Sequence, residues 1–559
     1  MLRTAKKSKI LREERPPFLT LIPNFAVLLR GSRKEKMARG KSIPRSPISS
    51  PPTPHPKPLE PTVPRNQAEE PLVLAIDIGT SSVRTTLFDR GGRAVEGVAA
   101  RQMHEITTSA EGASEADPDA LLEMVFTCLD RVVHQARDLD GKMKGVATCT
   151  FVNNILGIDQ NNRAVTPLTT YADTRAAGEV ARLRTDFDET LVHDRTGCRF
   201  HPSYLPARFR WLARTQPDLF HRVARFVSIG EYMEVKLFGE TAVSYSVASW
   251  TGLLNRSRLK WDTQLLAALP VKIEQLSPLT EANVPRRGLR PEFAARWPTL
   301  RNLSWFPAVG DGATANIGSG CISSARVALT VGTTSALRVV LNNPLDHLPS
   351  GLWCYRVDGR RSLLGGALSE GGSVFSWMMA TLHLGNLSEL EPFLAGLEPD
   401  AHGLTILPFL AGERSPGWAG GARATIHGLT LATTPLDILQ AGLEAVAYRI
   451  ALVFDLLRPV LSADPQLVAS GGALLNSPTW LKIITDVLGQ PVSVSKVQEA
   501  SGRGAALLAL EALGALADLE EAPDFVSAAH SPDPNLHARY HLAIERQQSL
   551  YEKLVKPGV

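Results

Sequence analysis

The sequence lacks the signals of a secreted or membrane protein. It contains only five cysteines in 559 residues, with no CxxC pair, and an odd, scattered set excludes a disulfide scaffold or a zinc ribbon. The apolar run at residues 18–29 is interrupted by Pro23 and has about half of the ~20 residues that span a bilayer. No small-residue cleavage site follows it, so we expect no signal peptide. We therefore predict a cytoplasmic protein without a membrane partner.

Aromatic residues are few, and the best-known nucleotide-binding motifs are absent. Aromatics make up 6%, charged residues 21% and hydrophobic residues 44%, values that exclude a collagen-like or wholly disordered chain. The length predicts two to four domain-sized units. No GxxxxGK[ST] pattern is present, and no GxGxxG follows a strand. The sequence therefore predicts neither a P-loop nor a Rossmann site.

Basic residues and prolines are concentrated in the first 66 residues. This stretch has 15 Lys and Arg against 4 Asp and Glu, together with 12 of the 39 prolines. The rest of the chain holds 45 basic and 52 acidic residues, so the pI of 8.7 gives no reason to expect a nucleic-acid partner. We predict a disordered, basic, Pro-rich tail over residues 1–70. The tail has either a targeting or nucleic-acid role, or it is a dispensable extension, such as an over-long start with Met37 or a later residue as the true first one.

From residue 71 on, β-branched runs alternate with amphipathic stretches, a pattern typical of α/β proteins. The first of these runs predicts a phosphate-binding hairpin, with strands at 72–78 and 83–88. Glycine lets a ligand approach the backbone, and Ser and Thr offer hydroxyl donors. Asp77, just before the turn, is placed to hold Mg²⁺ through water. The turn residues are Gly79, Thr80, Ser81 and Ser82. An ordinary hairpin with Ser and Thr satisfying its turn is the alternative.

The same layout recurs at residues 329–340, where a strand again enters a Gly-Thr-Thr-Ser turn that begins at Gly332. Two donor-rich hairpins about 250 residues apart suggest two related halves that grip a polyphosphate from both sides. A third glycine-rich segment, at residues 468–492, predicts a strand ending at Gly471-Gly472 and a helix from the N-cap Ser477 to Leu488. Its paired glycines suit a planar base or a ribose, although such loops are common in α/β proteins.

Four motifs in this order and spacing resemble the FGGY carbohydrate kinases of the actin-like sugar kinase ATPase superfamily. They are residues 77–82 (DIGTSS), 310–313 (GDGA), 332–334 (GTT) and 471–476 (GGALLN). Residues 424–444 are similar to the family's second signature and depart from it at Gly442. The resemblance covers residues 71 to about 515. It implies two actin-like, ribonuclease H-like α/β lobes around a central cleft, with lobes at 71–320 and 321–559.

The resemblance also implies ATP and Mg²⁺ as cofactors, and it gives roles to individual residues. The family's catalytic aspartate falls on Asp311, whose flanking glycines leave its carboxylate uncrowded; on its own it could equally cap a helix. Asp77 would organise the Mg²⁺ water. Contacts with the nucleotide phosphates are implied for Thr80, Ser81, Ser82, Arg84, Gly332 and Thr333, although Arg84 could be a solvated strand residue. The residues implied at the adenosine site are Gly372, Gly472 and Asn476.

Several segments look most like the gluconate kinase branch of the family: residues 166–175, 195–202, 248–255 and 412–418. Where many relatives have Met-His-Ser, this chain has Val152-Asn153-Asn154, and we expect Asn153 and Asn154 at the sugar hydroxyls. A sugar-acid carboxylate requires a cation, for which the candidates are His201, Arg208 and Arg414. Each could instead be a surface charge or a packed histidine. We expect Asp173 and Arg175 to form a structural pair.

These observations predict an ATP-dependent kinase of gluconate or a similar sugar acid, with Asp311 as general base and a small sugar as its partner. A kinase of a pentulose, a hexulose or a polyol is the nearest alternative. An actin-like nucleotide switch that phosphorylates nothing is the alternative of another class. A homodimer is possible in each case.

Overall fold

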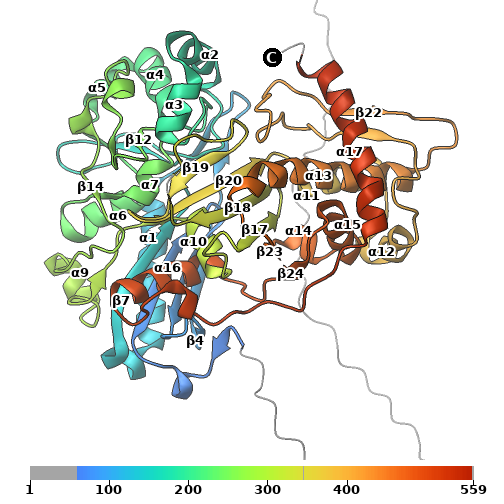
Figure 1. The fold of residues 1–559 in the computed structure, drawn as a ribbon. Helices are drawn as coiled ribbons and strands as arrows, with labels where there is room; N and C mark the ends of the chain where they lie inside the picture. Colours follow the sequence, from blue (N-terminus) through green and yellow to red (C-terminus); the bar gives the residue numbers. More distant parts are fainter. Residues whose placement is uncertain (1–59, 344, 557–559) are drawn as a thin grey trace, which may run out of the picture. The chain divides into compact units, whose positions relative to one another are not determined.

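The computed structural model describes residues 60–343 and 345–556. The predicted disordered tail lies outside the described residues as far as residue 59. The described chain forms two α/β lobes, each built on one mixed sheet (Figure 1).

The sheet of the N-terminal lobe has the strand order β1-β4-β3-β2-β7-β15. Strand β16 also pairs with β7, further along the strand than β15 does. Strand β2 runs antiparallel to β3 and parallel to β7. Every residue of β2 is buried, which explains its continuous apolar run, because a central strand is covered on both faces. The strands are β1 (Thr62–Val63), β2 (Leu72–Ile78), β3 (Ser82–Phe88), β4 (Ala94–Met103), β7 (Met143–Thr150), β15 (Ser304–Trp305) and β16 (Val309–Gly310).

The sheet of the C-terminal lobe repeats this arrangement, with the order β19-β20-β18-β17-β23-β24. Strand β17 is antiparallel to β18 and parallel to β23, as β2 is to β3 and β7. The duplicated hairpin expected from the two Gly-Thr turns is therefore confirmed as a duplicated half-sheet. The strands are β17 (Arg326–Val331), β18 (Ser335–Leu341), β19 (Trp353–Arg356), β20 (Ser362–Leu368), β23 (Gln466–Ser470) and β24 (Val492–Val494).

Two helices lie between the sheets: α10 (Asp311–Gly318) and α16 (Ala500–Ala512). Helix α16 comes late in the sequence, yet it packs on β2 and β7 of the N-terminal lobe and crosses α10. Figure 1 shows it, in red, beside the blue and cyan strands of that lobe. Its small residues Ala505 and Ala509 share a core with residues of both sheets, such as Val73 and Val340. These two helices therefore join the lobes.

The outer faces of the sheets carry longer amphipathic helices. In the N-terminal lobe α1 (Pro118–Gln135) covers β3 and β4, and α6 (Ile229–Phe238) packs on β7. In the C-terminal lobe α13 (Pro435–Leu457) covers β18 and β20, and it is followed outward by α15 (Pro478–Leu488) and α17 (Pro534–Leu554). The helix expected after Ser477 is confirmed, because Ser477 accepts a hydrogen bond from Trp480 N and Gly489 ends the helix in the left-handed region.

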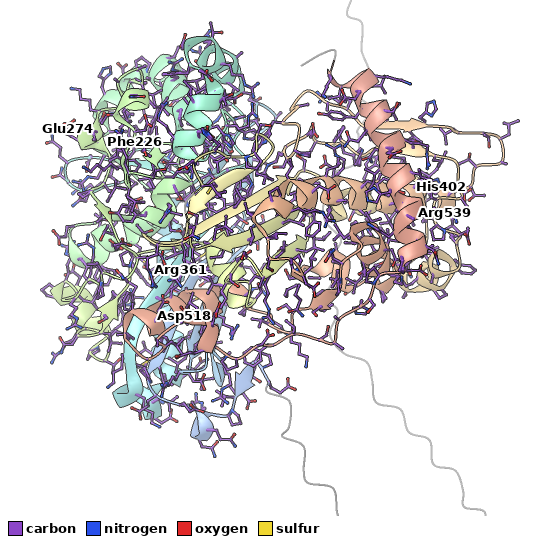
Figure 2. All side chains as sticks on the ribbon, in the orientation of Figure 1. Phe226, Glu274, Arg361, His402, Asp518 and Arg539 are labelled. Atoms are coloured by element: carbon purple, nitrogen blue, oxygen red, sulfur yellow. The ribbon has the colours of Figure 1, made fainter. Side chains whose placement is uncertain are left out.

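The N-terminal lobe also carries a region of short helices and small two- or three-stranded sheets, with its own core around Phe209 and Phe226. Figure 2 shows Phe226 inside this region. Its strands are β5 (Thr107–Thr108), β6 (Ser114–Ala116), β8 (Leu156–Ile158), β9 (Leu168–Thr169), β10 (Arg225–Val227), β11 (Val243–Ser244), β12 (Leu254–Asn255), β13 (Lys260–Trp261) and β14 (Leu279–Thr280). Its helices are α2 (Ala177–Asp186), α3 (Glu189–Thr196), α4 (Leu205–Thr215), α5 (Pro217–Arg222), α7 (Tyr245–Ser249) and α8 (Thr263–Leu266). Helix α9 (Pro291–Arg296) packs instead on the main core of the lobe, where Phe293 meets Phe126 of α1.

The remaining elements belong to the C-terminal lobe. They are α11 (Gly372–Thr381), α12 (Leu387–Ala395), α14 (Gly472–Leu475), β21 (Thr405–Leu407) and β22 (Thr425–His427). Among the described residues, no helix is both long and apolar enough to cross a membrane.

Residues 60–70, which the sequence placed in the disordered tail, are folded. Strand β1 pairs in parallel with β4 at the edge of the sheet, and Val63 is only 1% exposed. Arg65 follows in a short 3-10 helix and donates to the carbonyls of Glu96, Gly97 and Gln135 and to Asp138. The two apolar positions in this stretch, Val63 and Ala68, are buried. The surrounding prolines and charged residues masked this folded segment in the sequence.

Candidate functional site

The two hairpin turns present the predicted hydroxyl groups at their tips. In the first turn the main-chain N–H of Gly79 donates to the carbonyl of Ser82 at 3.0 Å, Thr80 is partly exposed and Ser81 is exposed. Ser82 itself is buried at the start of β3. In the second turn the N–H of Gly332 donates to the carbonyl of Thr334 at 3.0 Å, and Thr333 is exposed.

Two other glycine-rich turns of the C-terminal lobe pack against the second hairpin. The N–H of Gly372, at the start of α11, donates to the carbonyl of Gly332 at 2.7 Å, and Ser373 N donates to the carbonyl of Thr333 at 3.0 Å. Gly471 has φ +98°, and a Cβ there would lie 2.4 Å from the carbonyl oxygen of Val331. A Cβ at Gly372 would lie 2.7 Å from that of Ala473 in α14. Only glycine fits at these two positions.

This packing brings together the residues expected at the adenosine site. Gly472 begins α14, and Asn476 ends it by donating its main-chain N–H to the carbonyl of Gly472. Both lie in the turn that packs on Gly372 and on the hairpin of Gly332.

Asp77 lies at the end of β2 and forms an ion pair with Arg84, its cross-strand neighbour on β3. Arg84 Nη2 is 2.7 Å from Asp77 Oδ2, and Arg84 Nη1 is 2.9 Å from Oε2 of Glu499, the residue before α16. Asp77 is 2% exposed, yet neither of its oxygens forms a well-aligned hydrogen bond within the described chain. Burial raises its pKa, while Arg84 opposes the rise. The buried, under-satisfied carboxylate suits a hard cation or its water shell.

Asp311 lies beside Asp77. Across the sheet, Asp77 of β2 pairs with Cys149 of β7, and Cys149 pairs with Val309 of β16. Asp311 comes two residues after Val309, as the first residue of α10, and its Oδ1 accepts from Gly312 N at 2.8 Å. The predicted general base is therefore at the same sheet edge as the predicted metal-binding carboxylate.

The pKa of Asp311 is raised to about 7, chiefly by burial and then by the charge of Asp77. Arg338, the Gly312 N–H and Arg84 counteract this shift. A carboxylate with such a pKa is ionised in part at neutral pH and accepts a proton more readily than an ordinary aspartate.

An aromatic stack covers the glycines around Asp311. A Cβ at Gly310 would lie 2.7 Å from Nε1 of Trp250, and one at Gly312 would lie 3.1 Å from its ring. Trp250 stacks on Tyr355 at 3.6 Å, and its buried Nε1 has no hydrogen-bond partner in the described chain. The stack excludes water from one side of the base and leaves one donor beside it.

The two asparagines expected at the sugar differ in their surroundings. Asn153 has φ +57° and is partly exposed, and its amide donates to the carbonyl of Trp250 at 2.6 Å. Asn154 is 6% exposed; it donates to the carbonyl of Phe151 and accepts from Ile229 N at 2.8 Å. Asn154 thus fixes the main chain, while Asn153 borders Trp250.

Two of the three predicted carboxylate-binding residues, His201 and Arg208, are poorly suited to that role. Burial lowers the pKa of His201 to about 3, helped by Arg414 and Arg208, so its ring is neutral at pH 7. Arg208 is 6% exposed and donates to the main-chain carbonyls of Pro202, Asn153 and Thr170. The Asp173–Arg175 pair is present, and Arg175 also binds Glu115.

The structure adds Arg338, near Asp311, and the buried Glu370, directly before the Gly371-Gly372 turn. Arg338, on β18, has its Nε 3.8 Å from where a Cβ at Gly312 would lie. Glu370 is 1% exposed, neither carboxylate oxygen has a hydrogen-bond partner in the described chain, and burial raises its pKa to about 7. Arg338 could have been recognised in the sequence as a single arginine within an otherwise apolar strand. The same signal is present at Arg84 in the first hairpin.

A separate group of potential metal ligands lies far from this edge, at Asp400, His402 and Glu444. Figure 2 shows His402 next to α17. Glu444 accepts hydrogen bonds from Gln440, Tyr448 and His402, and Nδ1 of His402 accepts from Leu404 N. Both ring nitrogens of His402 are already hydrogen-bonded, so the histidine has no lone pair left for a metal. This group is therefore a structural network.

The duplicated half-sheets, their two glycine-hydroxyl hairpins and a carboxylate at the carboxyl ends of the strands agree with the two-lobed fold expected of a sugar kinase. Family comparison gives the same class. The model of the FGGY family of carbohydrate kinases matches residues 72–318 with its N-terminal domain and residues 327–513 with its C-terminal domain. The chain belongs to the FGGY family of carbohydrate kinases, which confirms the predicted family and fold class.

Among known proteins, the chain is similar to the gluconokinase of Bacillus subtilis (strain 168), at 25% identity over 473 residues, 83% of this chain and 91% of that protein. The crystal structure of a gluconate kinase from Lactobacillus acidophilus matches with a TM-score of 0.80 at 25% identity, covering 87% of this chain and 98% of that one. A xylulose kinase from the same organism matches with a TM-score of 0.80 at 25% identity, covering 86% and 98%. Glycerol and apulose kinases also match.

Proposed function

We propose that this protein transfers the γ-phosphoryl group of ATP to a hydroxyl of a sugar acid, with gluconate as the best candidate and 6-phosphogluconate as the product. The observation that carries the proposal is the position of Asp311. It lies at the sheet edge next to Asp77, and its pKa is raised to about 7. Phosphoryl transfer needs alignment, charge neutralisation and a base near the attacking hydroxyl.

In this proposal the hairpins and glycine turns hold the nucleotide. Arg84 binds the phosphates from the first half, while the exposed side chain of Thr333 binds them from the second. Thr80, Ser81, Ser82 and Gly332 complete the phosphate contacts. Gly372, Gly472 and Asn476 line the adenosine site, where the absence of side chains leaves flat main chain for the base.

Asp77 would hold Mg²⁺, because both of its buried oxygens lack a well-aligned hydrogen bond and carboxylate oxygen is a preferred Mg²⁺ ligand. When bound, the cation offsets the negative charge of the phosphates. Arg84 orients the Asp77 carboxylate through their ion pair.

Asp311 acts as the general base. Its carboxylate takes the proton of the acceptor hydroxyl as that oxygen forms its bond to the γ-phosphorus, and the bond from phosphorus to the bridging oxygen of ADP breaks. Trp250 covers the base and limits access of water, which would otherwise accept the phosphoryl group. Asn153 borders the acceptor beside Trp250, and Asn154, His201 and Arg208 shape the surrounding main chain.

A ketose is the second candidate acceptor, because the xylulose kinase and the gluconate kinase of Lactobacillus acidophilus match this fold with equal TM-scores of 0.80. A coupled assay of ADP release over sugar acids, ketoses and polyols tests both. The proposal expects the highest kcat/KM with gluconate or a close sugar acid, and little ADP release without sugar. Preference for a ketose would replace the acceptor. Nucleotide binding with no sugar-dependent ADP release would favour an actin-like switch.

A further inference from the structure

Arg338 faces the other lobe from the middle of β18. Its strand neighbours Leu337 and Val339 belong to the core under α13, whereas Val340 belongs to the core between the lobes. Because side chains alternate along a strand, Arg338 lies on the same face as Val340. Its cross-strand partner is Gly365, and a Cβ at Gly365 would lie 2.8 Å from the ring of Trp353. Arg338 is therefore beside the aromatic stack that covers the base.

Arg414 reaches the same region from the loop after β21. The loop is fixed to β20, because Ser415 N donates to the carbonyl of Ala367 at 3.0 Å. It also abuts the N-terminal lobe, where the ring of Trp418 lies 6.0 Å from that of His201. Arg414 directly precedes Ser415, whose Cβ lies 3.1 Å from where a Cβ at Gly366 would lie, and Gly366 follows the cross-strand partner of Arg338. In agreement with this position, the charge of Arg414 lowers the pKa of both His201 and Arg338.

Arg338 and Arg414 are partly exposed, and they lack the partners that buried arginines have. Arg361 pairs with Asp358 and Glu511, and Arg449 pairs with Glu413. Within residues 60–343 and 345–556, no carboxylate is ion-paired with Arg338 or Arg414, and the Nε of each is buried without a hydrogen-bond partner. The one polar contact of Arg338 is weak, at 3.5 Å to Thr330 Oγ1.

Two guanidinium groups with unpartnered Nε donors suit an anion, and the charge of Arg338 is offset in part by Asp311. Two anions reach this cleft in the proposed reaction: the carboxylate of the acceptor and the phosphates of the nucleotide. The phosphates already have the exposed hydroxyl groups of both hairpins, at Ser81 and Thr333. Arg338 instead lies near Gly312, and its cross-strand partner Gly365 meets Trp353, while the loop of Arg414 meets His201 through Trp418.

We propose that Arg338 and Arg414 bind the carboxylate of a sugar-acid acceptor and so select it over a neutral sugar. The inference rests on the proposed function. Planar guanidinium groups match the two oxygens of a carboxylate, which a neutral polyol cannot replace. With the carboxylate held by the arginines, the distal hydroxyls of the acceptor extend toward Asp311.

Isothermal titration tests this in the full-length protein, with gluconate, its neutral counterpart glucitol, and ADP as probes. Arg338→Gln and Arg414→Gln should each weaken gluconate binding at least about tenfold, because a charge-assisted hydrogen bond is lost. Both should leave the affinities for glucitol and ADP within about twofold. Arg360→Gln is the matched control, since Arg360 is exposed and pairs with Glu511 at the surface. Arg414→Lys, which keeps the charge, should recover part of the gluconate affinity.

The inference is overturned if wild-type protein binds gluconate and both variants bind it as tightly as Arg360→Gln does. It is equally overturned if the variants lose ADP affinity as much as gluconate affinity, because the arginines would then serve the phosphates. Failure of the proposed acceptor is a different result: wild-type protein would bind and phosphorylate no sugar acid, before any variant is made. Thermal unfolding of each variant separates a lost contact from a lost fold.

Discussion

Gly318 of α10 and Gly504 of α16 let these two helices touch backbone to backbone. A Cβ at Gly318 would lie 1.8 Å from the carbonyl oxygen of Ala500, and one at Gly504 would lie 1.8 Å from that of Thr314. Since α10 begins with Asp311 and α16 follows Glu499, the crossing fixes the base relative to the Arg84–Glu499 pair.

Gly504→Ala should therefore destabilise the protein by more than about 2 kcal/mol, because a methyl group cannot fit against the Thr314 carbonyl without separating the helices. Gly178→Ala is the control. Gly178 lies in α2 with nothing within 4 Å of a Cβ, so the change should be neutral or stabilising by up to about 1 kcal/mol. Urea unfolding measures both. Equal effects would mean that the helix crossing tolerates side chains.

Asp311→Asn should lower kcat by at least about 10²-fold, because an amide cannot accept the hydroxyl proton. Nucleotide affinity should stay within about twofold. Asp455→Asn, at a surface pair with Arg458 in the C-terminal lobe, is the control and should keep full activity. Steady-state assays and ADP titration give the two readouts. An Asp311→Asn enzyme with more than a tenth of wild-type kcat would remove the aspartate from the role of base.

Activity should rise with pH through the titration of Asp311, since only the ionised carboxylate accepts a proton. The apparent pKa in kcat/KM should be no higher than about 7, the value set by burial and by Asp77. A cation at Asp77 would lower it further. Glu370→Gln is the control, because the pKa of Glu370 is also raised to about 7. If that variant loses the acidic limb, the limb belongs to Glu370 and not to Asp311.

The same carboxyl should cost stability at alkaline pH. Its pKa is higher in the folded protein (about 7) than the ordinary 3.8, so the folded state holds the proton more tightly. That stabilisation is complete below about pH 4 and is lost as the pH rises through 7. Asp311→Asn should therefore be more stable than wild type at pH 8.5, by up to about 1.4 kcal/mol per unit of pKa difference. The gap should shrink toward pH 4. Chemical unfolding without nucleotide or metal measures it, and a gap independent of pH would contradict the raised pKa.

Asp77→Asn should raise the Mg²⁺ concentration for half-maximal activity at least about tenfold, because an amide oxygen carries no charge for the cation or its water. It should also lower the pKa of Asp311, since the charge of Asp77 contributes to the raised value. Mg²⁺ titrations at fixed ATP and pH profiles of the variant measure the two effects. A variant with unchanged Mg²⁺ dependence would place the metal elsewhere.

The sequence predicted those parts of the site that depend on local chemistry. Gly79 and Gly332 indicate tight turns, and the hydroxyl residues beside them indicate hydrogen-bond donors. Both hairpins could therefore be predicted from short stretches of sequence. Asp311 could be found through the resemblance of residues 310–313 to the family motif, since its flanking glycines alone would also fit a helix cap. The helix after Ser477 has an N-cap residue and a terminal glycine in its own sequence. Such local signals do not depend on contacts with the rest of the chain.

The sequence could not predict contacts that depend on packing between distant segments. The amphipathic pattern of α16 indicates a helix but does not say on which sheet it packs, and it packs on β2 and β7. Arg208 and Arg338 look alike as basic residues near apolar ones. Only the fold shows that Arg208 is bound by three main-chain carbonyls while Arg338 meets Gly312.

The two-residue strand β1 has a consequence for how the protein can be shortened. The family match begins at residue 72, which makes Pro71 an attractive place to cut. Thr62 and Val63, however, cover the outer side of β4. A version trimmed to Pro71 would uncover the main chain of β4 at Ala94 and Val95 and lengthen the part of this edge strand that is open to pairing with another molecule. Such exposed strands favour self-association.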